Sequence, residues 1–96
     1  MNILSFDELI RLGYSLSRDE IVDKVHFIEF SRANGIECIN FIVNVRDSVE
    51  PICYFAVCKV DGKTNDGLVL SPREAYAIAD VLHELEEYAH TARGGL

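Results

Sequence analysis

Residues 71–92 have the sequence SPREAYAIADVLHELEEYAHTA, and they carry the signals of one helix from its start to its end. Ser71 and Glu74 form a capping-box pattern, and Pro72 takes the first helical position, where its missing N–H costs nothing. Arg93 complements the negative end of the helix dipole, and the two glycines after it end the helix. Apolar residues at alternating spacings of three and four predict one buried stripe, made of Ala75, Ile78, Leu82, Leu85, Ala89 and Ala92. The helix therefore needs an apolar platform.

The middle of the chain supplies that platform as an antiparallel sheet that begins near Val25. Its register is set by Asn34-Gly35, because a type I′ turn needs positive φ at both central positions. A two-residue turn here pairs charge with charge and apolar with apolar. The pairs on the predicted core face are Arg32 with Glu37, Phe30 with Ile39, Ile28 with Phe41, and His26 with Val43. The pairs on the other face are Ser31 with Cys38, Glu29 with Asn40, and Phe27 with Ile42.

A third strand is predicted from Ile52 to Val60, after a polar loop at residues 46–51. Placing Val45 opposite Ile52 puts four residues on the core face, namely Tyr54, Ala56, Cys58 and Val60. The opposite face then gathers Cys53 and an apolar patch made of Phe27, Ile42, Phe55 and Val57. Because solvated sheet faces are usually less apolar, this face is expected to be covered by the N-terminal helices, by a second subunit or by a partner. After a turn-rich loop, residues 68–70 give a short edge strand.

Two short helices are predicted before the sheet. Ser5 and Glu8 form a capping box for a helix that ends at Leu12. The same pattern recurs at Ser17 and predicts a second helical segment at residues 19–24, whose inner side consists of Ile21, Val22 and Val25.

The expected fold is therefore one α+β domain over residues 1–96, because no linker or shift in composition divides the chain. It is a two-layer fold with short N-terminal helices, a three- to four-stranded antiparallel meander sheet, and a long C-terminal helix packed on that sheet.

The composition limits the function classes. With 49% hydrophobic and 26% charged residues, the chain has the composition of a globular protein. Its formal net charge of -7 repels phosphate backbones, so the expected partner is a protein with a basic surface and not nucleic acid. Three cysteines without a C-x-x-C pair indicate a reducing compartment, where they act as small buried apolar residues. With no apolar run near the ~20 residues of a membrane span and no signal-peptide pattern, a cytoplasmic protein is expected.

Three side chains on the last helix are the candidates for a metal site. His83, Glu87 and His90 stand at i, i+4 and i+7, where imidazole and carboxylate would converge on a divalent ion. The segment His83 to Glu87 begins like the H-E-x-x-H zinc motif, but Glu87 replaces the second histidine. The preferred interpretation is a solvated flank, so no metal or cofactor is expected, and metal binding by this helix stays an alternative.

Enzymatic chemistry finds little support in the sequence. A cysteine nucleophile would need a histidine base close by, but the predicted register puts His26 on the core face and Cys53 on the other. The glycines are scattered over turns and the C-terminus, so they form no phosphate-binding loop. The chain is therefore expected not to be an enzyme.

An acidic ridge on the last helix is the feature most relevant to binding. Asp80, Glu84 and Glu87 form an i, i+4, i+7 row opposite the predicted apolar stripe, with Glu86 beside it. Neighbours on such a row lie about 5–6 Å apart, similar to successive phosphates on a nucleic acid, so the ridge would fit a Lys/Arg groove that holds DNA or RNA. The alternative is an acidic outer face that only keeps the helix soluble.

Two resemblances follow from this layout. The order of helix, three-stranded meander and helix resembles double-stranded-RNA-binding domains, but that family starts its last helix with basic residues, whereas here Ser71-Pro72-Arg73-Glu74 leads into an acidic helix, so RNA binding is not expected. In size, charge and order of elements the whole chain also resembles small acidic inhibitors of phages and mobile elements, such as anti-CRISPR proteins. No motif supports this likeness, so it assigns no residue a role. It implies a protein that occupies a basic site on a CRISPR effector or another nucleic-acid enzyme.

The sequence thus predicts a non-enzymatic inhibitor that binds a protein partner. The partner-binding residues would be those of the acidic ridge, with the apolar patch as a second contact or a dimer seam: Asp80, Glu84, Glu86, Glu87, Phe27, Ile42, Phe55 and Val57. The alternative is a structural or regulatory homodimer that associates through its sheet face.

Overall fold

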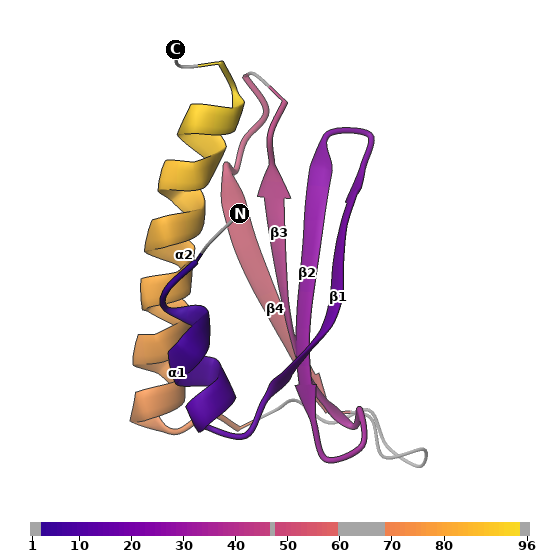
Figure 1. Ribbon diagram of the computed structural model, residues 1–96, viewed down its shortest axis with the longest axis vertical. Coiled ribbons are helices and arrows are strands. Elements are labelled where there is room, and N and C mark those ends of the chain that lie inside the picture. Colours follow the sequence, from indigo (N-terminus) through magenta and orange to yellow (C-terminus); the bar gives the residue numbers. More distant parts are fainter. Residues whose placement is uncertain (1–2, 47, 60–68, 95–96) are drawn as a thin grey trace.

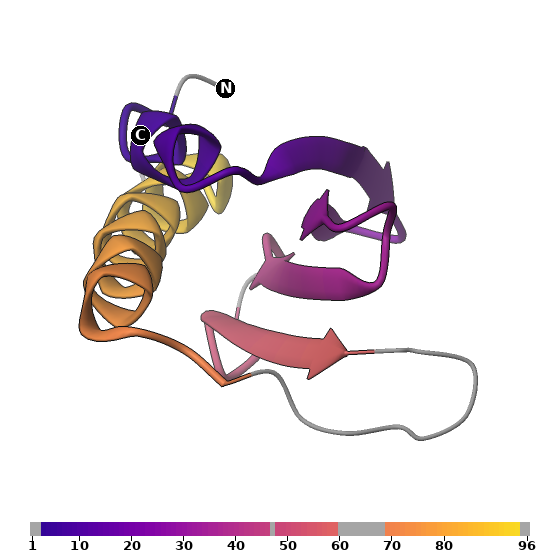
Figure 2. The same cartoon turned by 90° about the horizontal axis from the view of Figure 1, so that it is seen from below.

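A computed structural model describes residues 3–46, 48–59 and 69–94, which form a sheet covered on one face by two helices (Figures 1 and 2). The elements in chain order are α1 (Phe6–Arg11), β1 (Ser15–Val22), β2 (Val25–Arg32), β3 (Glu37–Asn44), β4 (Cys53–Lys59) and α2 (Pro72–Ala92). The four strands pair antiparallel in the order β1-β2-β3-β4, a simple meander. The predicted α+β fold with a long C-terminal helix on the sheet is confirmed.

Helix α2 begins and ends where the sequence predicts. The Ser71 hydroxyl accepts a hydrogen bond from the Glu74 amide and the Glu74 carboxylate accepts one from the Ser71 amide, so the capping box is complete. At the other end, Gly94 takes a φ of +84°. The buried stripe, however, is turned from the predicted one: Ala75 and Ala92 are exposed. The apolar residues that α2 buries are Ala77, Ile78, Val81, Leu85 and Ala89.

The central hairpin of β2 and β3 has the predicted register at every pair, from Arg32 opposite Glu37 to His26 opposite Val43. Its turn also has the predicted backbone, because Asn34 and Gly35 have φ values of 56° and 85°. The Ile36 amide closes the turn by donating to the Ala33 carbonyl at 3.1 Å. This hairpin supplies most of the sheet residues of the core.

The second predicted N-terminal helix is wrong, because residues 15–22 form strand β1, which pairs with β2. Asp23 and Lys24 make the turn between them with φ values of 51° and 63°. The Ser17 hydroxyl, predicted to cap a helix, instead donates to the Glu29 carbonyl at 3.2 Å and carboxylate at 2.8 Å, next to a register shift in β1. The capping pattern is local, whereas pairing with β2 is not, and the non-local interaction determines the outcome. The strand predicted at residues 68–70 is absent at residues 69 and 70, and residue 68 lies outside the described residues.

The predicted register of β4 is wrong by one residue. The Asn44 amide donates to the Ile52 carbonyl at 2.9 Å, so Asn44, and not Val45, lies opposite Ile52. A shift of one residue exchanges the two faces of a strand. Cys53, Phe55 and Val57 therefore lie on the helix side, opposite Val43, Phe41 and Ile39. Tyr54, Ala56 and Cys58 lie on the outer face, and Val60 is outside the described residues.

The loop between β3 and β4 is fastened to the end of α2, which explains this register. The Arg93 guanidinium donates from Nε to the Asn44 carbonyl at 3.1 Å and from a terminal nitrogen to the Val49 carbonyl at 2.5 Å. The Asn44 side chain donates to the Pro51 carbonyl at 2.6 Å. None of these contacts follows from the alternation of apolar and polar residues, on which the prediction relied.

A polar cluster lies where α2 starts, with two of its members buried and two half-buried. The Tyr14 hydroxyl donates to the Glu74 carboxylate at 2.8 Å, and the Arg32 guanidinium donates to the same oxygen at 3.0 Å and to Glu37 at 2.6 Å. Burial and the bond to Glu74 raise the pKa of Tyr14. For Glu74, burial acts to raise the pKa, but the hydrogen bonds from Tyr14 and Ser71 and the charge of Arg32 outweigh it and lower the pKa. Glu74 is therefore held as a carboxylate inside the fold.

Candidate functional site

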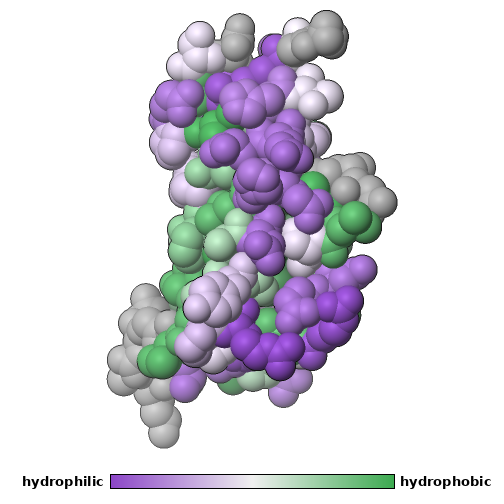
Figure 3. Space-filling view, turned by 90° about the vertical axis from the view of Figure 1, so that its left-hand side faces the viewer, coloured by the Kyte–Doolittle hydropathy of each residue, from purple (hydrophilic) through white to green (hydrophobic). Residues whose placement is uncertain are grey.

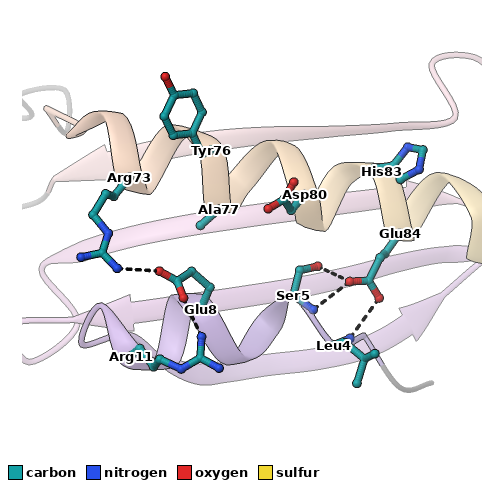
Figure 4. Close-up of a pocket in the computed structure, with 10 residues that line it drawn as sticks. All are labelled: Leu4, Ser5, Glu8, Arg11, Arg73, Tyr76, Ala77, Asp80, His83 and Glu84. Atoms are coloured by element: carbon teal, nitrogen blue, oxygen red, sulfur yellow. Dashed lines mark hydrogen bonds and ion pairs between the residues drawn. The ribbon is translucent and has the colours of Figure 1, made fainter.

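The helix side of the molecule carries a groove between α1 and α2. Figure 3 shows this side, where hydrophilic side chains run down the middle and apolar ones lie beside them. The groove encloses about 580 Å³ and is lined by Leu4, Ser5, Glu8, Arg11, Arg73, Tyr76, Ala77, Asp80, His83 and Glu84 (Figure 4). It is the candidate functional site because it combines a concave shape with charged groups from two elements.

One end of the groove is closed by Glu84. Its carboxylate accepts hydrogen bonds from the Leu4 amide at 3.0 Å, the Ser5 amide at 2.8 Å and the Ser5 hydroxyl at 2.5 Å (Figure 4). The hydroxyl bond is the largest of the effects that lower the pKa of Glu84. Ser5 was predicted to cap α1 with Glu8, but its side chain makes no cap bond to α1. Glu84, 79 residues away in sequence, accepts the hydrogen bond from the Ser5 amide that Glu8 would accept in a capping box. No local pattern indicates this contact.

The other end of the groove is closed by Glu8, which bridges the two helices. Its carboxylate lies 2.6 Å from Arg11 on its own helix and 3.3 Å from Arg73 on α2. Both arginines are mostly exposed, so these are surface ion pairs of small energetic value. The single Glu8 carboxylate compensates one of the two positive charges that Arg11 and Arg73 place at this end of the groove.

Between the two ends, α2 lines the groove with Tyr76, Asp80 and His83. Tyr76 is 70% exposed, and Asp80 one turn later is also exposed. Within residues 3–46, 48–59 and 69–94, Asp80 has no ion-pair partner. His83, which follows on the same side of α2, lies with Nε2 3.6 Å from Glu87 Oε1.

The predicted acidic ridge is therefore divided. Asp80, Glu86 and Glu87 are exposed, but Glu84 holds the N-terminal residues and is only partly accessible. The row was predicted to lie opposite the apolar stripe. Because the buried face of α2 is turned from that prediction, Glu84 contacts the residues just before α1 and is half-buried.

The predicted apolar patch is divided as well. The corrected register of β4 leaves Phe27 and Ile42 on the outer face of the sheet and puts Phe55 and Val57 on the helix side. Among the described residues, both helices lie on the helix side, so they do not cover the outer face as one alternative expected (Figure 2).

His26 and Cys53 have structural contacts. His26 is 4% exposed, and its ring nitrogens lie 3.0 Å from the Tyr88 hydroxyl and 2.5 Å from the Asp19 carboxylate. Cys53 lies on the same face as His26, contrary to prediction, with its sulfur 3.6 Å from the Leu82 carbonyl. Burial raises the pKa of Cys53, which disfavours the thiolate.

In the part of the chain that the structure describes, no three His, Cys, Asp or Glu side chains lie close enough together to bind a metal ion. His83 and Glu87 make one weak pair with 75% and 73% of their side chains exposed.

Comparisons with known proteins gave no relative, since no family model, no curated protein and no solved structure matches this chain. None of the helices in the described part is long and apolar enough to span a bilayer. The function is therefore inferred from the groove and from the charges around it.

Proposed function

We propose that this protein is a non-enzymatic inhibitor that binds a basic, nucleic-acid-binding site of a partner protein through the exposed side of α2. The observation that supports it is the pair of Tyr76 and Asp80 on the α2 wall of the groove. An exposed aromatic ring and a carboxylate without an ion-pair partner among the described residues, one helical turn apart, suit a Lys or Arg side chain. The ring attracts the cation at its face, and the carboxylate accepts its hydrogen bonds.

The surrounding charges favour the same kind of partner. Glu87 continues the exposed acidic side of α2 beyond the groove, and Glu86 adds an exposed carboxylate on the side of α2 nearer to Cys53. The formal net charge of -7 attracts a basic surface over a distance and speeds association with it. Glu84 is no longer part of the proposed contact, because its oxygens already bind the N-terminal residues.

The class of partner follows from the chemistry of such a site. Grooves that hold nucleic-acid phosphates present Lys and Arg side chains, which would also accept the carboxylates of α2, so a nucleic-acid enzyme is proposed as the partner. The resemblance in layout to small acidic phage inhibitors makes a CRISPR effector one member of this class.

Glu84 is expected to contribute to the stability of the fold and not to partner binding. Glu84→Ala removes three hydrogen bonds at the start of α1 and is expected to lower the free energy of unfolding by about 1–2 kcal/mol. Denaturant unfolding measures this change, and hydrogen exchange at the amides of Leu4 and Ser5 should become faster. Glu87→Ala, the control three residues along, should change neither. Equal effects of the two variants would show that the Glu84 contacts do not stabilise α1.

Binding is tested by reversing charges that do not hold the fold together. The double variant Asp80→Lys/Glu87→Lys is expected to weaken capture of the partner by about tenfold or more, mainly through slower association. The tagged protein is used as bait in a bacterial lysate treated with nuclease, and captured proteins are identified and quantified by mass spectrometry. The expected result is a nucleic-acid-binding protein that added DNA releases from the wild type.

The matched control changes the same amount of charge elsewhere. Glu20 and Asp23 are exposed on β1 and its turn, so Glu20→Lys/Asp23→Lys alters the net charge equally while leaving α2 intact. The control should retain capture. If both double variants lose it equally, net charge and not α2 is responsible. If nothing that DNA displaces is captured, the proposed function is wrong.

A further inference from the structure

Two cysteines lie opposite one another on the outer face of the sheet. Cys38 in β3 and Cys58 in β4 are Cα partners in the antiparallel register. Directly opposite residues point to the same face, with Cα atoms about 4.5–5.5 Å apart. Disulfides need Cα atoms roughly 4.4–6.8 Å apart, so the backbone already holds this pair at a bridging distance.

The surroundings of the pair leave it accessible. Both residues are half-buried, and in the described part of the chain the two helices lie on the other face of the sheet (Figure 2). The Cys38 sulfur also lies 3.2 Å from the Gly35 carbonyl, a weak contact that oxidation would replace at little cost. The sheet thus presents two thiols side by side to a small reagent.

We propose that Cys38 and Cys58 are a thiol–disulfide modification site, which a low-molecular-weight disulfide of the glutathione type oxidises to a bridge between β3 and β4. One cysteine thiolate attacks the reagent disulfide, forming a mixed disulfide and releasing one glutathione thiolate. The second cysteine thiolate attacks the protein sulfur of that mixed disulfide and releases the other glutathione. The two protein thiols lose two protons and two electrons, and the reagent is reduced to two thiols.

The third cysteine lies outside this site. Cys53 lies on the helix side of β4, because it precedes Cys58 by five positions and an odd offset puts two strand residues on opposite faces. Its sulfur contacts the Leu82 carbonyl of α2 at 3.6 Å, on the face of the sheet away from Cys38 and Cys58. The proposal therefore predicts that two of the three thiols react together and one does not.

The rate of the reaction should depend on pH. Burial, with Glu29 and Cys58 nearby, raises the pKa of Cys38. Because the thiolate is the reactive form, oxidation should become faster as pH rises from neutral.

The test begins by incubating the purified protein with oxidised glutathione. The remaining thiols are then blocked by alkylation under denaturing conditions, and mass spectrometry measures the intact mass and identifies linked peptides. The expected product is a monomer that has lost two hydrogens, carries one alkyl group and contains a Cys38–Cys58 link that dithiothreitol reverses. Cys53→Ala should give the same link and leave no thiol. Cys58→Ser should give no internal link and at most one bound glutathione at Cys38.

Three results would overturn the proposal. The first is three alkylated thiols after prolonged exposure to oxidised glutathione. The second is glutathione bound stably to both Cys38 and Cys58, which would show that the sulfurs do not meet. The third is a bridge that includes Cys53 or joins two chains. If Cys53→Ala also forms the Cys38–Cys58 link, the link does not depend on rearrangement through the third thiol.

Discussion

Replacing Glu74 by alanine is expected to lower the free energy of unfolding by roughly 3 kcal/mol, a large part of the stability of a small domain. The reason is that the substitution leaves the buried Tyr14 hydroxyl, which donates at 2.8 Å, without its acceptor. It removes one acceptor, at 3.0 Å, from the half-buried Arg32 guanidinium, which keeps its bond to Glu37. It also removes the carboxylate half of the capping box at Ser71. Urea unfolding of the variant beside the exposed control Glu87→Ala measures the difference. Similar values for both would mean that the polar cluster does not stabilise the protein.

The same carboxylate makes stability depend on pH. Because the pKa of Glu74 is lower in the folded protein than in the unfolded chain, its contribution is fully present above the unfolded value of about 4.3 and is lost as pH falls through the folded pKa. The difference in stability between the wild type and Glu74→Gln should therefore be constant near neutral pH and shrink in acid. A difference that grows in acid would contradict the direction of the pKa shift.

The second large effect is expected at Val81, at the centre of the buried face of α2. Val81 is fully buried, so Val81→Asp would put an unpaired carboxylate into the apolar core at a cost on the order of 4 kcal/mol or more. The variant should be unfolded or collapsed by circular dichroism. Ala75, six residues earlier on the same helix, is exposed, so Ala75→Asp should fold like the wild type. The reverse outcome would show that the helix buries the stripe predicted from sequence.

The pair of Val81 and Ala75 also shows what the sequence could not determine about α2. Its ends follow from local chemistry, so Ser71, Pro72 and Gly94 were sufficient to predict them. The buried face depends on which of two adjacent stripes meets the sheet, and both stripes have apolar residues at intervals of three and four. The helix is rich in alanine, which contributes little to either stripe and left the choice to tertiary packing.

In the strands, too, the features that depend on nearby residues were predicted and those that depend on distant residues were not. The β2–β3 register could be predicted because the turn and the paired side chains agreed. Strand β1 could not, because all eight of its residues are exposed and it shows no strong alternation. The β4 register depended on how a longer loop closes, and that loop is fixed by Arg93 from the far end of the chain.

The candidate site was predicted only in part. The exposed positions of Asp80, Glu86 and Glu87 followed from the acidic sequence of α2, whereas the groove arises where α1 meets α2 and has no sequence signal of its own. Glu84 is a carboxylate on α2 like Asp80 and Glu87, yet its hydrogen bonds stabilise the fold. The sign that could have suggested this is the Ser5 amide at the N-cap of α1, because a helix start leaves its first amides without an intrahelical acceptor.

Helix α2 is fastened to the sheet at both ends, by Glu74 to Arg32 of β2 and by Arg93 to the carbonyl of Asn44 in β3. Sliding the helix along its axis, or rolling it, would break both attachments at once. Its exposed side is therefore held rigidly. Asp80 and Glu87 are separated along the helix axis by roughly 10 Å, at 1.5 Å per residue. A ligand that spans the two carboxylates meets a fixed spacing, and binding restricts only side-chain motion because the backbone was already ordered on folding. Discrimination between ligands would then depend on how well the spacing of their cations matches that of the helix.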